Sequence, residues 1–212
     1  SEPAVGVMIV CSGASEKQLT DMLNTLDKYG VKGTFYVTGD FVRRNPERIQ
    51  RIIDAGHELG SHGNNLINMT EVSYARVQEN IRELNDLCEE TFGVRPRLFC
   101  AHLGATNSIV TAIARAEGVE DCLFAIDACD WSDAYKDKVY QMVYRVTSDR
   151  VTSGCVVQFH INGYHTAEVL DKALDNWINV KGLRPVTVGE LMQLSGRDFP
   201  CLLYTSPSPR DA

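Results

Sequence analysis

The chain lacks several features that would assign it to a protein class at once. No apolar run approaches the ~20 residues that a membrane-spanning helix needs. No internal repeat or low-complexity segment precedes residue 197. No CxxC pair occurs, which argues against a structural zinc ribbon. A signal-peptide pattern is also missing, although a cleaved precursor would look the same. What remains is a globular domain of ordinary composition.

Basic residues are also not in excess. The 212 residues include 21 Lys and Arg against 28 Asp and Glu, for a formal net charge of −7. This balance disfavours nucleic acid and anionic lipid, so we expect no nucleic-acid partner and no membrane span. The length fits one domain, which we place at residues 1–196. The Pro- and Ser-rich residues 197–212 are interpreted as a tail of the kind that cloning leaves behind.

Cysteine is present in an odd number, seven, and several copies lie in apolar runs where the thiol behaves as a small hydrophobe. We therefore expect mostly buried free thiols. One or two disulfides in an exported protein are the alternative. A single glycosylation sequon, Asn68-Met69-Thr70, is compatible with export.

Strand-like and helix-like segments alternate about seven times. Apolar, β-branched runs at residues 5–11, 33–38, 97–100, 122–126, 155–160 and 185–188 predict strands, and so does the short apolar run that ends in His62. Helical spacing predicts helices near residues 15–29, 46–55, 73–92, 106–117, 136–148 and 166–177, and a short helix that ends at Leu194. Alternation with short connections favours a parallel sheet covered by helices, either an open doubly wound sheet or a barrel.

Side chains able to do chemistry gather just after the predicted strands. Three of the five histidines, His62, His102 and His160, occupy such positions. The carboxyl ends of parallel strands meet at one face, so these imidazoles are expected to share a cleft. Four residues after His62 stands Leu66, where a second histidine would have completed a metal pair.

Three segments carry a family resemblance: GTFYVTGDFV at 33–42, NPERIQRIIDAGHELGSH at 45–62 and GVRPRLF at 93–99. Through them, residues 5 to about 194 resemble the polysaccharide deacetylases, carbohydrate esterase family 4, which include chitin and peptidoglycan deacetylases. The resemblance implies an α/β fold, a distorted (β/α) barrel of about seven parallel strands. It also implies a zinc-type, metal-dependent deacetylase site. Within that family the chain resembles a fungal-type, chitin deacetylase-like member with a degraded active site.

The metal and base positions of that family are mostly changed in this chain. The family's first strand ends in two aspartates, the general base and a metal ligand, where this chain has Cys11 and Ser12. The family's two histidine ligands correspond to His62 and Leu66. One ligand of three is kept, and zinc affinity depends on several ligands held together. No cofactor is therefore expected, although the family uses zinc or another divalent metal.

In the third family motif an arginine pairs with the base, and Cys100 stands at its position. Both partners are lost together, which avoids a buried unpaired charge costing ~3–5 kcal/mol. His160 corresponds to the family's catalytic acid, and Asp130 would orient it. Ile161 replaces an aspartate. The expected substrate contacts are Trp131, His102, Leu103 and Tyr164.

These positions favour a deacetylase-like protein that is inactive, extracellular and associated with a cell wall or spore wall. Its expected partner is chitin or a related N-acetylated glycan. The alternatives are an active N-deacetylase with an unorthodox site, and a glycan- or protein-binding module on the same frame. The plainest interpretation of His62 is a loop-tying histidine, and that of His160 with Asp130 is a buried remnant pair.

Two other uses of the cysteines stay open. Cys11, Cys100, His62 and His102 could form a different, thiolate-containing metal site, because thiolates and imidazoles suit zinc. Alternatively, a Cys11–Cys100 disulfide could replace the lost ion pair, provided that the two Cα atoms lie within ~7 Å.

Overall fold

A computed structural model describes residues 2–203. Eight strands form one sheet, in which every pairing is parallel: β1 (Ala4–Cys11), β2 (Thr34–Val37), β3 (Glu58–Ser61), β4 (Leu98–Phe99), β5 (Glu120–Asp121), β6 (Ile126–Asp127), β7 (Val156–His160) and β8 (Arg184–Val186). Seven strands follow the order β5-β4-β3-β2-β1-β7-β6, and β8 pairs with the first half of β1. Within residues 2–203, β5 and β6 do not pair, so the sheet curls into a half-barrel with an open seam. The predicted distorted barrel of parallel strands is confirmed.

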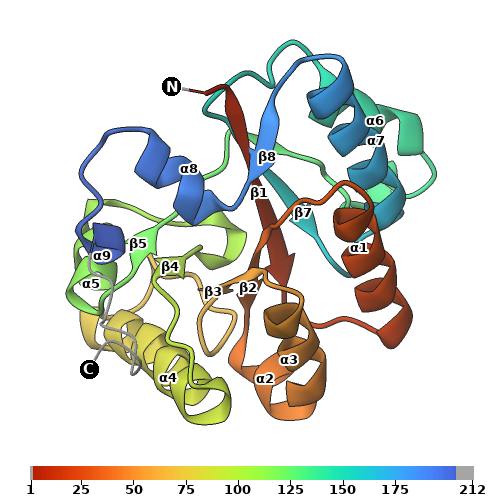
Figure 1. Ribbon diagram of the computed structural model, residues 1–212. Helices are drawn as coiled ribbons and strands as arrows, with labels where there is room; N and C mark the ends of the chain where they lie inside the picture. Colours follow the sequence, from red (N-terminus) through yellow and green to blue (C-terminus); the bar gives the residue numbers. More distant parts are fainter. Residues whose placement is uncertain (1, 204–212) are drawn as a thin grey trace, which may run out of the picture.

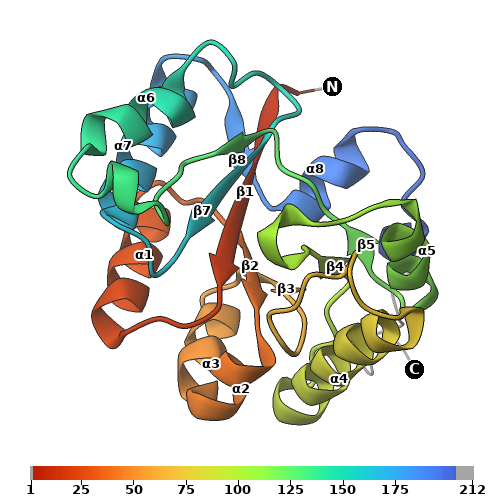
Figure 2. The same ribbon diagram turned by 180° about the vertical axis from the view of Figure 1, so that it is seen from behind.

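Helices surround the sheet (Figures 1 and 2). They are α1 (Glu16–Lys28), α2 (Gly39–Arg44), α3 (Pro46–Asp54), α4 (Tyr74–Phe92), α5 (Ser108–Ala116), α6 (Val139–Thr147), α7 (Thr166–Asn179), α8 (Val188–Leu194) and α9 (Pro200–Leu203). Two 3₁₀ turns, His102–Gly104 and Asp133–Tyr135, lie in the loops after β4 and β6. No helix in the described range is both long and apolar enough to cross a membrane.

Successive side chains of β1 point alternately into two separate layers of the hydrophobic core. Its odd-numbered residues, Val5 to Cys11, face the large cluster beneath α1, α3, α6 and α7. Met8 and Val10 face the barrel interior together with Tyr36 and Cys100. Successive side chains of a strand point to opposite faces, so one residue of register decides which layer a side chain enters.

One predicted strand, at residues 122–126, is wrong. The structure has the short strands β5 and β6 on either side of a loop at residues 122–125. β5 pairs with β4 and β6 with β7, at opposite ends of the strand order. The chain crosses the open seam between these two edges, so residues 122–125 form a loop and each short strand pairs with one edge only.

The segment predicted as a tail begins inside the described range. Phe199 and Leu202 are buried in the cluster of the barrel interior, against α8. The rest of the predicted tail, residues 204–212, lies outside the described residues. The domain boundary at residue 196 stays a prediction.

His57 is a structural histidine and gives a pH-dependence prediction. Its Nδ1 accepts a hydrogen bond from the Gly33 N–H at 3.1 Å, and burial, with a smaller effect of Lys32, lowers its pKa to about 4. Between pH 6.5 and 4 the unfolded chain therefore takes up a proton at this imidazole that the folded chain does not. The free energy of unfolding should fall by up to about 3 kcal/mol across this window.

Urea unfolding of the wild type and of His57→Gln at pH 7 and pH 4.5 checks this prediction. Glutamine can still accept from Gly33 but does not titrate, so the variant should lose less stability on acidification. Equal losses in the two proteins would contradict the prediction.

Candidate functional site

A cleft of about 430 Å³ opens at the carboxyl ends of the strands. It brings together seven of the ten residues that the sequence singles out: Ser12, His62, Leu66, His102, Leu103, Trp131 and His160. Parallel strands place their last residues at one face, which is why positions 12 to 160 converge there. The other three, Cys11, Asp130 and Tyr164, are not among the lining residues.

Seven further lining residues were not predicted as site residues: Val10, Ala101, Gly104, Phe124, Asp127, Gln158 and Asn162. Asp127 ends β6, so the position of strand ends could have indicated it. Gln158 lies two residues before His160 on β7 and shares its face, which alternation could have indicated. Phe124 lies in the loop that crosses the seam, and no sequence pattern predicts that crossing.

His160 is held by Asp130, which is fully buried behind it. The Asp130 carboxylate accepts three hydrogen bonds, each of 2.8 Å: from the His160 backbone N–H, from His160 Nδ1 and from the Thr166 hydroxyl. The proton on Nδ1 leaves Nε2 as the ring nitrogen available to the cleft. This is the contact expected from the sequence, and the catalytic role of the pair stays a prediction.

His62 is a buried, neutral imidazole. Its Nδ1 lies 2.8 Å from the Cys100 carbonyl oxygen and 3.1 Å from the Cys100 sulfur. Burial lowers the pKa of His62 to about 4, although the bond to the Cys100 carbonyl acts in the opposite direction. Its ring also meets the edge of His102, with 6.0 Å between the ring centroids. A donor bond to a carbonyl fixes the tautomer and leaves Nε2 as the only lone pair that His62 can offer.

Cys11 lies outside the cleft. It is fully buried in the cluster beneath the helices, and burial raises the pKa of its thiol. A thiol without solvent contact and with a raised pKa is inert as a base or as a ligand. All seven cysteines are free thiols in the structure, and Cys11 and Cys100 belong to different core clusters. The Cys11–Cys100 disulfide is therefore absent.

Tyr164 points elsewhere than the sequence predicts. Its hydroxyl donates to Asp133, and Lys136 lies over its ring at 5.8 Å. These contacts hold the phenol against the loop after β6, and Tyr164 is not a lining residue of the cleft.

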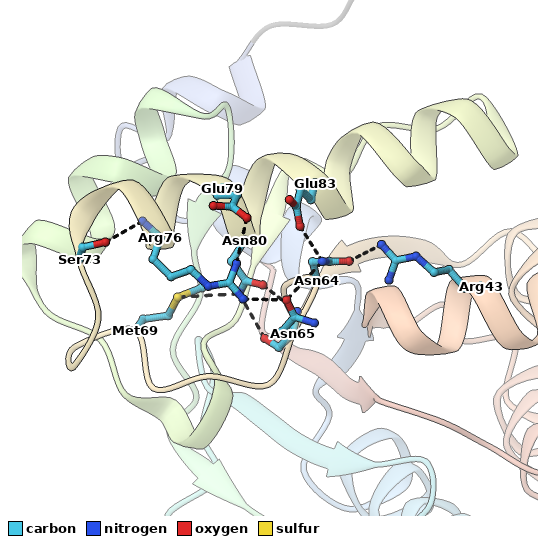
Figure 3. Close-up of polar contacts among 9 residues, drawn as sticks. All are labelled: Arg43, Asn64, Asn65, Met69, Ser73, Arg76, Glu79, Asn80 and Glu83. Carbon is cyan, nitrogen blue, oxygen red and sulfur yellow. Dashed lines mark hydrogen bonds and ion pairs between the residues drawn. The ribbon is translucent and has the colours of Figure 1, made fainter.

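The loop that carries His62 and Leu66 is fixed to α4 (Figure 3). The buried Asn80 side chain accepts from the Asn65 backbone N–H at 2.7 Å and donates to the Asn65 carbonyl at 3.2 Å. Asn64 bridges Arg43 of α2 and Glu83 of α4, with 2.7 Å for each bond. The loop is held from both sides, which places Leu66 at the cleft with half of its surface exposed.

The donor atoms do not fit the zinc-type site that the resemblance implies. Around His62 the corresponding ligand positions offer a hydroxyl at Ser12 and an alkyl group at Leu66. Among residues 2–203, one group of three candidate ligands clusters within 4.8 Å, namely Asp127, Asp130 and His160. The carboxylates of this group already accept hydrogen bonds. Asp127 accepts from Trp131 Nε1 and from the Cys129 N–H, each at 2.9 Å.

The thiolate-containing site of Cys11, Cys100, His62 and His102 does not form, because Cys11 faces the other core layer.

Comparison with known proteins agrees with the fold. A family model described as polysaccharide deacetylase matches residues 12–121. An uncharacterised protein of Bacillus subtilis, YlxY, is 32% identical over 191 residues, which are 90% of this chain and 58% of that protein. The peptidoglycan-N-acetylglucosamine deacetylase PgdA of Listeria monocytogenes is 28% identical over 179 residues, which are 84% of this chain and 37% of that enzyme. The chain thus spans less than two thirds of the length of either relative.

Two solved structures share the fold. The peptidoglycan deacetylase PdaC of Bacillus subtilis superposes with a TM-score of 0.79 at 24% identity, covering 92% of both chains. A carbohydrate esterase family 4 pseudoenzyme of Bacillus anthracis superposes with a TM-score of 0.82 at 23% identity, covering 91% of this chain and 66% of that one. The family model covers more than half of the sequence, and the described strands form the same curled sheet. The chain therefore belongs to the polysaccharide deacetylase family.

Proposed function

We propose that this domain binds an N-acetylated glycan in the cleft and does not deacetylate it by the metal-dependent route. One observation carries the proposal. The cleft is lined by an exposed Trp131 and by His160, which Asp130 holds from behind, but its potential metal position consists of His62, Ser12 and Leu66.

The cleft has the mixed lining that small carbohydrate units require. Trp131 is 58% exposed, and its indole is oriented by the bond from Nε1 to Asp127. Leu66 and Leu103 add apolar surface, while His102 and Asn162 add polar groups. Apolar walls with a few convergent polar groups are typical of ligand sites, and an exposed indole can cover the apolar face of a sugar ring.

The proposed ligand follows from the names of the relatives. PgdA of Listeria and PdaA of Bacillus subtilis are named as deacetylases of peptidoglycan sugars. The chitin deacetylase-like assignment made from the sequence is a narrower form of the same proposal. N-acetylglucosamine is the unit common to both glycans, so fragments of either can test binding. Wall association and an extracellular location belong to this proposal as well.

Loss of turnover follows from the chemistry of amide hydrolysis. A base must activate water and a positive centre must stabilise the oxyanion. Cys11, at the base position, is buried away from the cleft, and His62 alone offers one nitrogen. The structural neighbour from Bacillus anthracis is described as a pseudoenzyme, which supports this interpretation.

The second candidate is an active deacetylase with an unorthodox site. The bond between His160 and Asp130 favours it, because it would hold His160 as the acid that the resemblance implies. A protein-binding module on the same frame is the third.

Calorimetric titration with chito-oligosaccharides and with peptidoglycan fragments tests the proposal. We expect binding to the wild type and affinity lowered about tenfold, or about 1.4 kcal/mol, in Trp131→Ala. A parallel assay should detect no acetate release above that of His160→Ala. No heat with either glycan would remove the binding proposal, and acetate release abolished by His160→Ala would favour the enzyme.

A further inference from the structure

A second aromatic surface lies outside the cleft, on α6. Tyr140 and Tyr144 are 74% and 70% exposed, and their i, i+4 spacing places them on one face of the helix. Together with Tyr135, Gln141 and Arg145 they line a groove of about 480 Å³, called here the tyrosine groove.

The side chains of the tyrosine groove suit a sugar as ligand better than they suit the apolar surface of a protein partner. All five lining side chains combine an apolar body with a polar end, and none is aliphatic. Within residues 2–203 the three phenol hydroxyls make no hydrogen bond, and Arg145 uses its Nε alone. Ring faces beside free hydroxyl, amide and guanidinium groups match the apolar faces and hydroxyl edges of pyranose rings.

The tyrosine groove is joined to the cleft through Asp127. The Asp127 carboxylate accepts from Trp131 Nε1 at 2.9 Å, and its carbonyl accepts from Arg145 Nε at 2.8 Å. Arg145 in turn lies over the Tyr135 ring at 6.0 Å. α6 follows β6 in the chain, through the 3₁₀ turn Asp133–Tyr135 that supplies Tyr135 to the tyrosine groove.

We propose that the tyrosine groove binds further sugar units of the same N-acetylated glycan whose other units occupy the cleft. This inference rests on the proposed function, because it extends the same ligand beyond Trp131. Its consequence is dependence on ligand length. A short oligosaccharide should fill the cleft alone, whereas a long one should also reach α6.

Calorimetry with the chitin disaccharide and hexasaccharide tests this on the full chain. The double variant Tyr140→Ala/Tyr144→Ala should bind the hexasaccharide about tenfold more weakly than the wild type, which corresponds to about 1.4 kcal/mol. Its affinity for the disaccharide should not change. Both side chains are mostly exposed, so the fold should tolerate the change.

Tyr74→Ala is the matched control, because Tyr74 is an equally exposed tyrosine, at 66%, on the first turn of α4. It should leave both affinities unchanged. Tyr140→Phe/Tyr144→Phe keeps the aromatic rings and should retain most of the gain in affinity from the disaccharide to the hexasaccharide.

Three outcomes would contradict the inference. If the wild type binds both oligosaccharides and the double alanine variant matches it with each, the inference fails and the proposed function stands. If the wild type binds neither, both fail. If the substitutions change only self-association in sedimentation, the groove is a contact between copies and the inference is overturned.

Discussion

Zinc affinity is expected to rise at least ~100-fold, or about 2.7 kcal/mol, when Ser12→Asp and Leu66→His are introduced together. Both positions line the cleft with His62, whose Nδ1 is already anchored on the Cys100 carbonyl. The double variant would supply a carboxylate and two imidazoles, the number of protein ligands found in open zinc sites. Zinc titration against a chelator of known affinity measures the gain.

Controls for this experiment come from the same three positions. Each single variant should gain little, since affinity depends on ligands held together, and adding His62→Ala to the double variant should remove the gain. Cys11→Asp is left out, because Cys11 lies in the apolar cluster and a carboxylate there would be buried without a partner. A double variant that binds zinc no more tightly than the wild type would show that these positions do not converge as described.

Replacing Asp130 by alanine is expected to lower the free energy of unfolding by about 3–5 kcal/mol. The side chain is fully buried and accepts three hydrogen bonds, so its removal leaves the His160 and Thr166 donors without partners. Urea unfolding measures the loss. Asp133→Ala is the control, since this exposed carboxylate has only the Tyr164 hydroxyl as partner, and it should cost less than about 1 kcal/mol. A similar small cost for Asp130→Ala would contradict the described network.

Much of the fold could be predicted from the sequence because its signals are local. The run at residues 5–11 is a buried strand, and α1, which a Ser15–Gln18 capping box begins, lies within the helix predicted near residues 15–29. The chain from 120 to 127 could not be predicted in the same way. Its strands are two residues long, and their separation depends on which distant strands they pair with.

The sequence could predict several of the residues that line the cleft, but not the directions in which side chains point. Strand ends indicated His62, His102 and His160, and the structure brings them to one cleft. The sequence could not reveal that Cys11 faces the helices, because the pleat decides this at the last residue of β1. Nor could it reveal the left-handed backbone of Leu103, with φ of 62°, which depends on the loop around it.

Elemental analysis of the wild-type chain, purified without chelators and then equilibrated with excess zinc and desalted, tests the central claim most directly. With one available imidazole nitrogen at His62, a hydroxyl at Ser12 and an alkyl group at Leu66, the account predicts well under one zinc ion per chain. A retained stoichiometric ion that disappears in His62→Ala would contradict it.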